Sequence, residues 1–200
     1  MILVGRQAPD FTSAAVLANG EIINDFSFYK TIKNKYALLF FYPLDFTFVC
    51  PSELIALHNR IQQFQERNVE VIAASVDSHY THNAWRNTLA ENGGIGKINF
   101  TLIADLNHTI CQSYGIEHPE LGVALRGAFI IDKNKIVRHQ MVNDLPLGRN
   151  IDELIRLVDA LQYHEQHGEV CPAGWSKGNK AMAATPEGVA SYLGNYAKGL

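Results

Sequence analysis

Two hydrophobic periods alternate along most of the chain. Residues 36–42 (YALLFFY) form a continuous apolar and aromatic run, which is typical of a strand buried on both faces of a sheet. Across residues 52–64, apolar side chains recur every three or four positions, which predicts an amphipathic helix. Residues 69–76 predict a second buried strand, and residues 79–92 predict a second helix that ends at Gly93 and Gly94.

Shorter elements continue this alternation. The pattern predicts strands at 100–104, 127–131 and 136–142, a short helix at 108–114 and an amphipathic helix at 151–163. The polar residues 132–135 join the last two strands as a hairpin turn. Strands that alternate with helices, followed by a hairpin and a final helix, predict an α/β protein with a central mixed β-sheet flanked by helices, in the order of a thioredoxin-like fold.

The last part of the chain has little periodicity and several glycines and prolines. We therefore predict a domain of residues 1–163 and a C-terminal arm of residues 164–200. Within the arm, Val189, Tyr192, Leu193 and Tyr196 recur at helical spacing, which predicts a helix near residues 186–197.

Charge and hydropathy exclude several functions. The chain has 17 basic and 20 acidic residues, a formal net charge of -3 and no run of Lys or Arg. This balance argues against binding to nucleic acid or to an anionic membrane surface. No apolar stretch approaches the ~20 residues of a membrane-spanning helix. The first residues show no basic region followed by an apolar one, so we expect no secretory signal and a cytoplasmic protein.

Three cysteines are an odd number for a disulfide framework, and no Cys-x-x-Cys motif occurs. Cys50 precedes Pro51 and Glu53, as a residue at a helix N-terminus would. The positive end of the helix dipole would stabilise a thiolate there, although a small residue packed between a strand and a helix fits the same position.

The other two cysteines differ in context. Cys171 lies in the glycine- and proline-containing arm, where there is little core to fill, so a redox role is favoured. Cys111 lies in an apolar stretch of a short helix and is interpreted as an inert buried thiol.

Histidine spacing does not support a metal site or other cofactor. His79 and His82 share a helical spacing, as do His164 and His167, but neither pair has a third ligand at motif spacing. These histidines are interpreted as surface residues. We expect no cofactor and no metal.

Two segments around the cysteines resemble the peroxiredoxin family. Residues 41–51 (FYPLDFTFVCP) resemble its Pro-x-x-x-Thr-x-x-Cys signature. Residues 169–172 (EVCP) resemble the resolving-cysteine segment of its typical 2-Cys subgroup, which includes the peroxidase component of alkyl hydroperoxide reductases and the thioredoxin peroxidases. Further matching segments fall in order from Gly5 to Trp175.

The resemblance implies a thiol-dependent peroxidase that reduces hydrogen peroxide and alkyl hydroperoxides in antioxidant defence. Cys50 would be the peroxidatic cysteine and Cys171 the resolving cysteine. The resemblance also assigns Pro43, Thr47 and Arg126 to the peroxide site, with Glu53 and Arg149 as supporting residues.

The resemblance further implies an intersubunit disulfide in a homodimer, and five such dimers in a ring-shaped decamer. A thioredoxin or a flavoprotein disulfide reductase would reduce that disulfide, since the chain has no dithiol or flavin motif of its own. Two other functions stay open: a non-enzymatic holdase, and a general disulfide oxidoreductase, against which the missing Cys-x-x-Cys argues.

Overoxidation-sensitive relatives carry a Gly-Gly-Leu-Gly loop and a C-terminal helix with Tyr-Phe. This chain has Gly93-Gly94-Ile95-Gly96 and Tyr192-Leu193 at these places. We therefore expect intermediate sensitivity.

Overall fold

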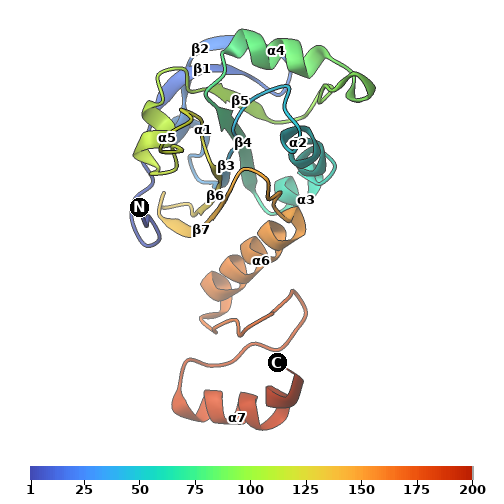
Figure 1. Ribbon diagram of the computed structural model, residues 1–200. Helices are drawn as coiled ribbons and strands as arrows, with labels where there is room; N and C mark the ends of the chain where they lie inside the picture. Colours follow the sequence, from blue (N-terminus) through green and yellow to red (C-terminus); the bar gives the residue numbers. More distant parts are fainter. Residues whose placement is uncertain (200) are drawn as a thin grey trace. The chain divides into compact units, whose positions relative to one another are not determined.

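The computed structural model describes residues 1–199, and its centre is a seven-stranded mixed sheet with the strand order β2-β1-β5-β4-β3-β6-β7 (Figure 1). The strands are β1 (Thr12–Val16), β2 (Ile22–Ser27), β3 (Tyr36–Phe41), β4 (Val69–Ser75), β5 (Thr101–Ala104), β6 (Arg126–Ile131) and β7 (Val137–Asn143). The α-helices are α1 (Phe28–Thr31), α2 (Cys50–His58), α3 (Ile61–Glu66), α4 (His79–Asn87), α5 (Thr109–Ser113), α6 (Ile151–His167) and α7 (Pro186–Tyr196), with short 3-10 turns η1 (Ala90–Asn92) and η2 (Ala197–Gly199).

The middle of the sheet is buried on both faces. Strand β3 pairs in parallel with β4 and antiparallel with β6, and all six of its residues are buried. Successive side chains of a strand point to opposite faces. Leu39 and Phe41 join a core cluster with Phe28 of α1 and Tyr114, which follows α5. Helices α1 and α5 lie on one side of the sheet and α2 and α3 on the other (Figure 1).

The predicted α/β fold and its central elements are confirmed, but two predicted helices are shorter than expected. The helix over 52–64 is interrupted, because α2 ends at His58 and α3 begins at Ile61. The helix over 79–92 ends at Asn87, since Thr88 is extended, and a 3-10 turn then ends at Gly93 with φ +80°. A Cβ on Gly94 would clash with the Thr88 carbonyl oxygen, so the chain folds back tightly there.

The N-terminal hairpin was not predicted from the sequence. Strand β2 contains Asn24 and Asp25, which are uncommon in strands, and its residues alternate only weakly. Strand β2 is at the edge of the sheet, where one neighbour is enough to hold it.

The chain divides into two compact units, Met1–Ile151 and Asp152–Leu200. Helix α6 begins at the division and extends to His167, where Gly168 with φ +70° follows it. The predicted boundary between residues 163 and 164 stays a prediction. Within the described residues, no helix has both the length and the apolar character needed to cross a membrane.

Candidate active site

Cys50 is the first residue of α2 and is fully buried. Pro51 occupies the first turn, where its missing N–H costs no hydrogen bond. The buried strand β3 delivers the chain to residues 43–49, and this loop leads directly into the helix. The predicted position of Cys50 at a helix N-terminus is therefore confirmed.

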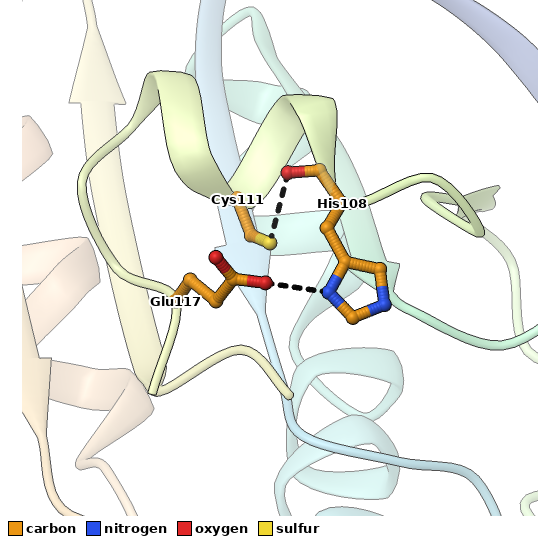
Figure 2. Close-up of side chains that lie close together, drawn as sticks. All are labelled: His108, Cys111 and Glu117. Carbon is orange, nitrogen blue, oxygen red and sulfur yellow. Dashed lines mark hydrogen bonds and ion pairs between the residues drawn. The ribbon is translucent and has the colours of Figure 1, made fainter. Parts of the chain in front are cut away.

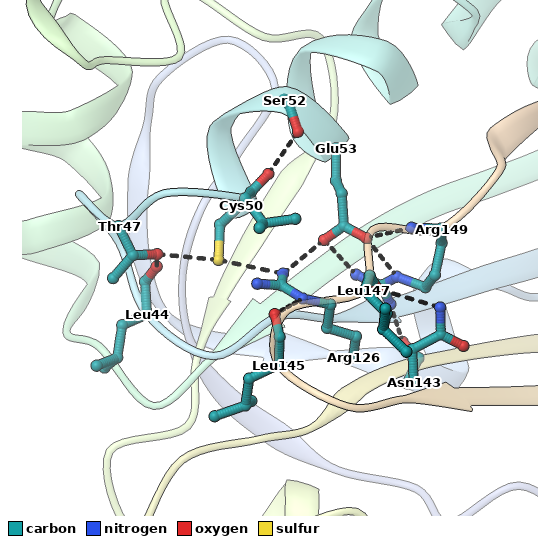
Figure 3. A network of polar contacts seen from close by, with 12 residues as sticks. Leu44, Thr47, Cys50, Ser52, Glu53, Arg126, Asn143, Leu145, Leu147 and Arg149 are labelled. Carbon is teal, nitrogen blue, oxygen red and sulfur yellow. Dashed lines mark hydrogen bonds and ion pairs between the residues drawn. The ribbon is translucent and has the colours of Figure 1, made fainter.

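Two donors converge on the Cys50 sulfur (Figure 3). Thr47 Oγ1 lies 3.0 Å from Sγ, and Arg126 Nη1 lies 3.4 Å from it. Thr47 Oγ1 is also 2.8 Å from the carbonyl oxygen of Leu44. Because a hydroxyl has one proton, Thr47 donates a hydrogen bond either to the Leu44 carbonyl or to a thiolate at Cys50. When it donates to Leu44, its oxygen can accept a hydrogen bond from the Cys50 thiol. Thr47 can thus serve both protonation states of Cys50.

Glu53 holds the arginines of the site in place. Its Oε2 is 2.8 Å from Arg126 Nη1, and its Oε1 accepts from the backbone N–H and Nε of Arg149 at 2.8 and 2.9 Å. Arg126 Nε donates to the Leu145 carbonyl oxygen at 2.6 Å. Both carboxylate oxygens and both guanidinium groups therefore have fixed partners, which fixes the orientation of the Arg126 fork toward Cys50.

Three buried charged side chains surround the Cys50 sulfur on its arginine side. Glu53, Arg126 and Arg149 are all at most 7% exposed. Burial lowers the pKa of Arg149, while its hydrogen bond and attraction to Glu53 act in the opposite direction. Two guanidinium charges against one carboxylate leave one positive charge, which a thiolate would balance.

An apolar pocket of about 660 Å³ opens beside the sulfur's two donors. Thr47 and Arg126 are its polar lining groups. The other lining residues are Pro43, Leu44, Phe48, Val49, Leu121, Val123, Leu145 and Pro146. The structure therefore brings together six predicted site residues, namely Pro43, Thr47, Cys50, Glu53, Arg126 and Arg149.

A buried polar network anchors the loop that carries Thr47, and the sequence did not reveal it. Asp45 accepts from Tyr42 Oη at 2.8 Å and lies 2.7 Å from His82 Nδ1. The Asp45 backbone N–H donates to Asp77 at 2.8 Å. Desolvation raises the pKa of Asp45, and the hydrogen bond from His82 opposes that shift. The interpretation of His82 as a surface residue was wrong, because its side chain is fully buried.

The other two cysteines lie in surroundings that differ from those of Cys50. Cys111 is buried, and desolvation together with Asp105 raises the pKa of its thiol to about 12, so it is a poor nucleophile. Cys171 belongs to the second unit, where its Sγ lies 3.5 Å from the Ala160 carbonyl oxygen. All three cysteines are free thiols.

Other pocket residues were also missed by sequence reasoning. Leu121 and Val123 lie in the loop before β6, and two apolar residues in a loop do not by themselves indicate a pocket. Leu145 contributes a backbone carbonyl, which no side-chain pattern can reveal. The segment 143–149 did stand out as a whole, and it supplies both Leu145 and Arg149.

Comparison with known proteins places this geometry in a family. The AhpC/TSA family matches residues 4–140, and the C-terminal domain of 1-Cys peroxiredoxin matches residues 160–195. The chain is 56% identical over 198 residues to alkyl hydroperoxide reductase C of Buchnera aphidicola subsp. Baizongia pistaciae, covering 99% of this chain and 100% of that protein. It is 47% identical over 194 residues to the mitochondrial thioredoxin-dependent peroxide reductase of Rattus norvegicus, covering 95% of this chain and 73% of that protein.

A solved structure agrees with these sequence matches. The reduced 2-Cys peroxiredoxin of Plasmodium vivax is 47% identical, with a TM-score of 0.94 over 98% of this chain and 100% of that chain. The buried cysteine at a helix N-terminus, its threonine and arginine donors and these matches together lead to one assignment. The chain belongs to the AhpC/TSA family and is a peroxiredoxin, an enzyme that reduces peroxides.

Proposed function

We propose that Cys50 is the peroxidatic cysteine and that Thr47 and Arg126 stabilise the transition state of its reaction. The observation that carries this proposal is the convergence of Thr47 Oγ1 and Arg126 Nη1 on the Cys50 sulfur, at 3.0 and 3.4 Å. Both donors also line the pocket, so a peroxide bound there meets the same groups that contact the thiolate.

The proposed reaction breaks one O–O bond and forms one S–O bond. The Cys50 thiolate attacks one oxygen of the hydroperoxide, and the other oxygen leaves with the electron pair of the O–O bond. It takes a proton and departs as an alcohol, or as water from hydrogen peroxide, while Cys50 becomes a sulfenic acid. Negative charge moves from sulfur to the leaving oxygen, and prearranged donors beside both atoms stabilise that transfer. Pro43 shields the sulfur from water in this proposal.

The pocket lining supports alkyl hydroperoxides as substrates beside hydrogen peroxide. Eight of the ten lining side chains are apolar, and the volume of about 660 Å³ exceeds what hydrogen peroxide needs. Burial of an alkyl group against this wall would contribute about 0.8 kcal/mol per CH₂ group.

Cys171 is the proposed resolving cysteine. Its thiolate would attack the sulfur of the Cys50 sulfenic acid, release the oxygen as water and leave a disulfide.

We place the two cysteines on different subunits of a homodimer that assembles into a decamer. A thioredoxin or a flavoprotein disulfide reductase would then reduce the disulfide, and the name of the Rattus norvegicus relative, a thioredoxin-dependent peroxide reductase, supports the thioredoxin. A cytoplasmic location is part of this proposal.

The test compares full-length Cys50→Ser with Cys111→Ser as the matched thiol control. Peroxide consumption is followed with dithiothreitol and with a thioredoxin system. We expect Cys50→Ser to lose activity in both assays and Cys111→Ser to keep it. Activity retained by Cys50→Ser would overturn the proposal, and protection of an aggregating client by that variant would favour the holdase function.

A further inference from the structure

Three metal-ligating side chains converge beside α5, within the first unit (Figure 2). His108 directly precedes the helix, Cys111 lies in its first turn, and Glu117 follows it by four residues. One ligand atom from each residue lies within 4.8 Å of the other two. None of these residues belongs to the peroxide site.

The local structure orients all three ligands. His108 has a left-handed backbone with φ +62°, and its ring points toward Glu117 (Figure 2). The buried Asp105 accepts from the backbone N–H groups of Ile110 and Cys111 at 3.0 and 2.7 Å, which fixes the turn that carries the sulfur. The turn that carries Cys111 is thus held by a buried carboxylate.

Glu117 has two partners of its own. Its Oε1 is 2.6 Å from His108 Nδ1, and its Oε2 accepts from Gln112 Nε2 at 2.9 Å. The backbone of Glu117 also pairs with Ala124 in an antiparallel bridge. Gln112 therefore stands as an outer partner of the carboxylate, which is the usual arrangement around metal-bound side chains.

The distances are close to those of a zinc site. Tetrahedral zinc with bonds of ~2.3 Å to sulfur and ~2.0–2.2 Å to nitrogen and oxygen separates its ligand atoms by roughly 3.3–3.6 Å. His108 Nδ1 and Glu117 Oε1, now 2.6 Å apart, would have to part by somewhat less than one ångström, and the sulfur, within 4.8 Å of the other ligand atoms, would have to approach them by about one ångström at most. Rotation of the partly exposed His108 and Glu117 side chains, each 28% exposed, supplies movements of this size.

We propose that His108, Cys111 and Glu117 form a zinc-binding site with Nδ1, Sγ and a carboxylate oxygen as ligands. A nitrogen, a thiolate and an oxygen suit Zn²⁺ and exclude Mg²⁺ and Ca²⁺, which prefer oxygen ligands alone. Cys111 is buried while the other two ligands reach the surface, so water can complete the coordination from the open side.

Binding exchanges protons for the metal ion. The Cys111 thiol, whose Sγ lies 3.3 Å from the His108 carbonyl oxygen, releases its proton to solvent. With the metal on His108 Nδ1, the neutral ring carries its proton on Nε2, and the hydrogen bond from Nδ1 to Glu117 is replaced by the two bonds to the metal. The simpler interpretation is a surface His–Glu pair beside an inert core thiol, and it predicts no metal affinity.

The position of the site gives zinc a structural consequence. The ligand Glu117 begins the loop whose Leu121 and Val123 line the peroxide pocket. A metal bridge from α5 to Glu117 would tie one end of this pocket wall to the core of the first unit.

The test uses the full chain with Cys50→Ser and Cys171→Ser, so that Cys111 is the remaining thiol. Zinc affinity is measured by competition with a chromophoric chelator, and Co²⁺ substitution reports thiolate ligation through its charge-transfer absorption. We expect one Zn²⁺ per chain, a thiolate-to-cobalt band, and a rise in Tm with zinc.

Single substitutions in this background identify the ligands. Cys111→Ser, Glu117→Gln and His108→Asn should each weaken zinc binding at least about 100-fold, and Gln112→Ala about 10-fold. Asparagine tolerates the left-handed backbone of position 108. His58→Asn, outside the cluster, is the matched control and should leave the affinity unchanged.

Two results would overturn the proposal: no saturable binding of one zinc per chain, or binding that survives Cys111→Ser without a thiolate band. Far-UV circular dichroism checks the fold of each variant. If His108→Asn fails to fold, Cys111→Ser and Glu117→Gln decide, because both keep nearly the native shape.

Discussion

Arg126 binds Glu53 through the same guanidinium nitrogen that faces the active-site sulfur. Nη1 lies 2.8 Å from Glu53 Oε2 and 3.4 Å from Cys50 Sγ. The carboxylate therefore holds a hydrogen-bond donor in place beside the reacting atom. Glu53 is a positioning residue, since it acts on the sulfur only through the arginine.

Glu53→Gln should destabilise the protein, because it leaves two buried guanidinium groups without their counter-charge. We expect a loss of about 3–5 kcal/mol in the free energy of unfolding, measured by urea denaturation. The control is Glu70→Gln, which breaks the partly exposed pair with Lys35 at 2.6 Å and should cost less than about 1 kcal/mol. Equal losses in the two variants would contradict the role assigned to Glu53.

Thr47→Val should lower kcat/KM for hydrogen peroxide by roughly 10²–10³-fold, since valine keeps the shape of threonine and removes the hydroxyl beside the sulfur. Thr47→Ser keeps the hydroxyl and should stay within about 10-fold of the parent enzyme. Stopped-flow measurement of Cys50 oxidation isolates this step from reduction of the disulfide. If Thr47→Val oxidises at Cys50 as fast as the parent enzyme, Arg126 and the N-terminus of α2 are sufficient to stabilise the transition state without the hydroxyl.

The fold could be predicted from sequence wherever a segment was strongly periodic, as at residues 36–42 and 69–76. The edge strand β2 could not, because its register comes from pairing with β1 rather than from its own pattern. Cys50, Thr47 and Arg126 were found through motifs, and the charge balance around Glu53 required coordinates. The Asp45–His82 pair was missed because 37 positions separate partners that meet only in the folded protein.

A peroxide-dependent covalent dimer should form between Cys50 and Cys171 of different subunits. Non-reducing electrophoresis after one equivalent of peroxide should show this dimer in the parent protein and in Cys111→Ser. Either Cys50→Ser or Cys171→Ser should abolish it. A dimer that persists in Cys171→Ser would implicate pairing between two Cys50 residues or with Cys111.

The rate of disulfide formation should rise with pH from neutrality upward. Desolvation raises the pKa of Cys171, while Arg156 acts to lower it and Glu169 to raise it. The thiolate is the attacking species, so a raised pKa leaves less of it at neutral pH, and the rate should climb by up to about tenfold per pH unit until that pKa is passed.

Arg156 offers a check on this explanation. Arg156→Gln removes the nearby positive charge, so the pKa of Cys171 should rise further and the rate at neutral pH should fall. Arg156→Lys keeps the charge and should restore the parent pH profile. A profile that is the same in all three proteins would mean that another step limits disulfide formation.

Truncation after Thr185 should make the enzyme more resistant to overoxidation. Cys50 is fully buried in the first turn of α2, so this turn must unwind before the sulfenic acid can meet Cys171. The slower the unwinding, the longer the sulfenic acid stays exposed to a second peroxide. The resemblance to overoxidation-sensitive relatives assigns this slowing to a C-terminal helix, and α7 has exposed apolar side chains at Val189, Leu193 and Tyr196.

Leu193 stands where those relatives carry phenylalanine, and the smaller apolar area predicts weaker docking. Leu193→Phe should therefore raise the yield of sulfinic acid at a given peroxide concentration, and Leu193→Ala should lower it toward that of the truncated protein. Mass spectrometry of Cys50 during turnover at rising peroxide gives these yields directly. Equal yields in the full-length and truncated proteins would show that α7 does not restrain the unwinding of the active-site helix.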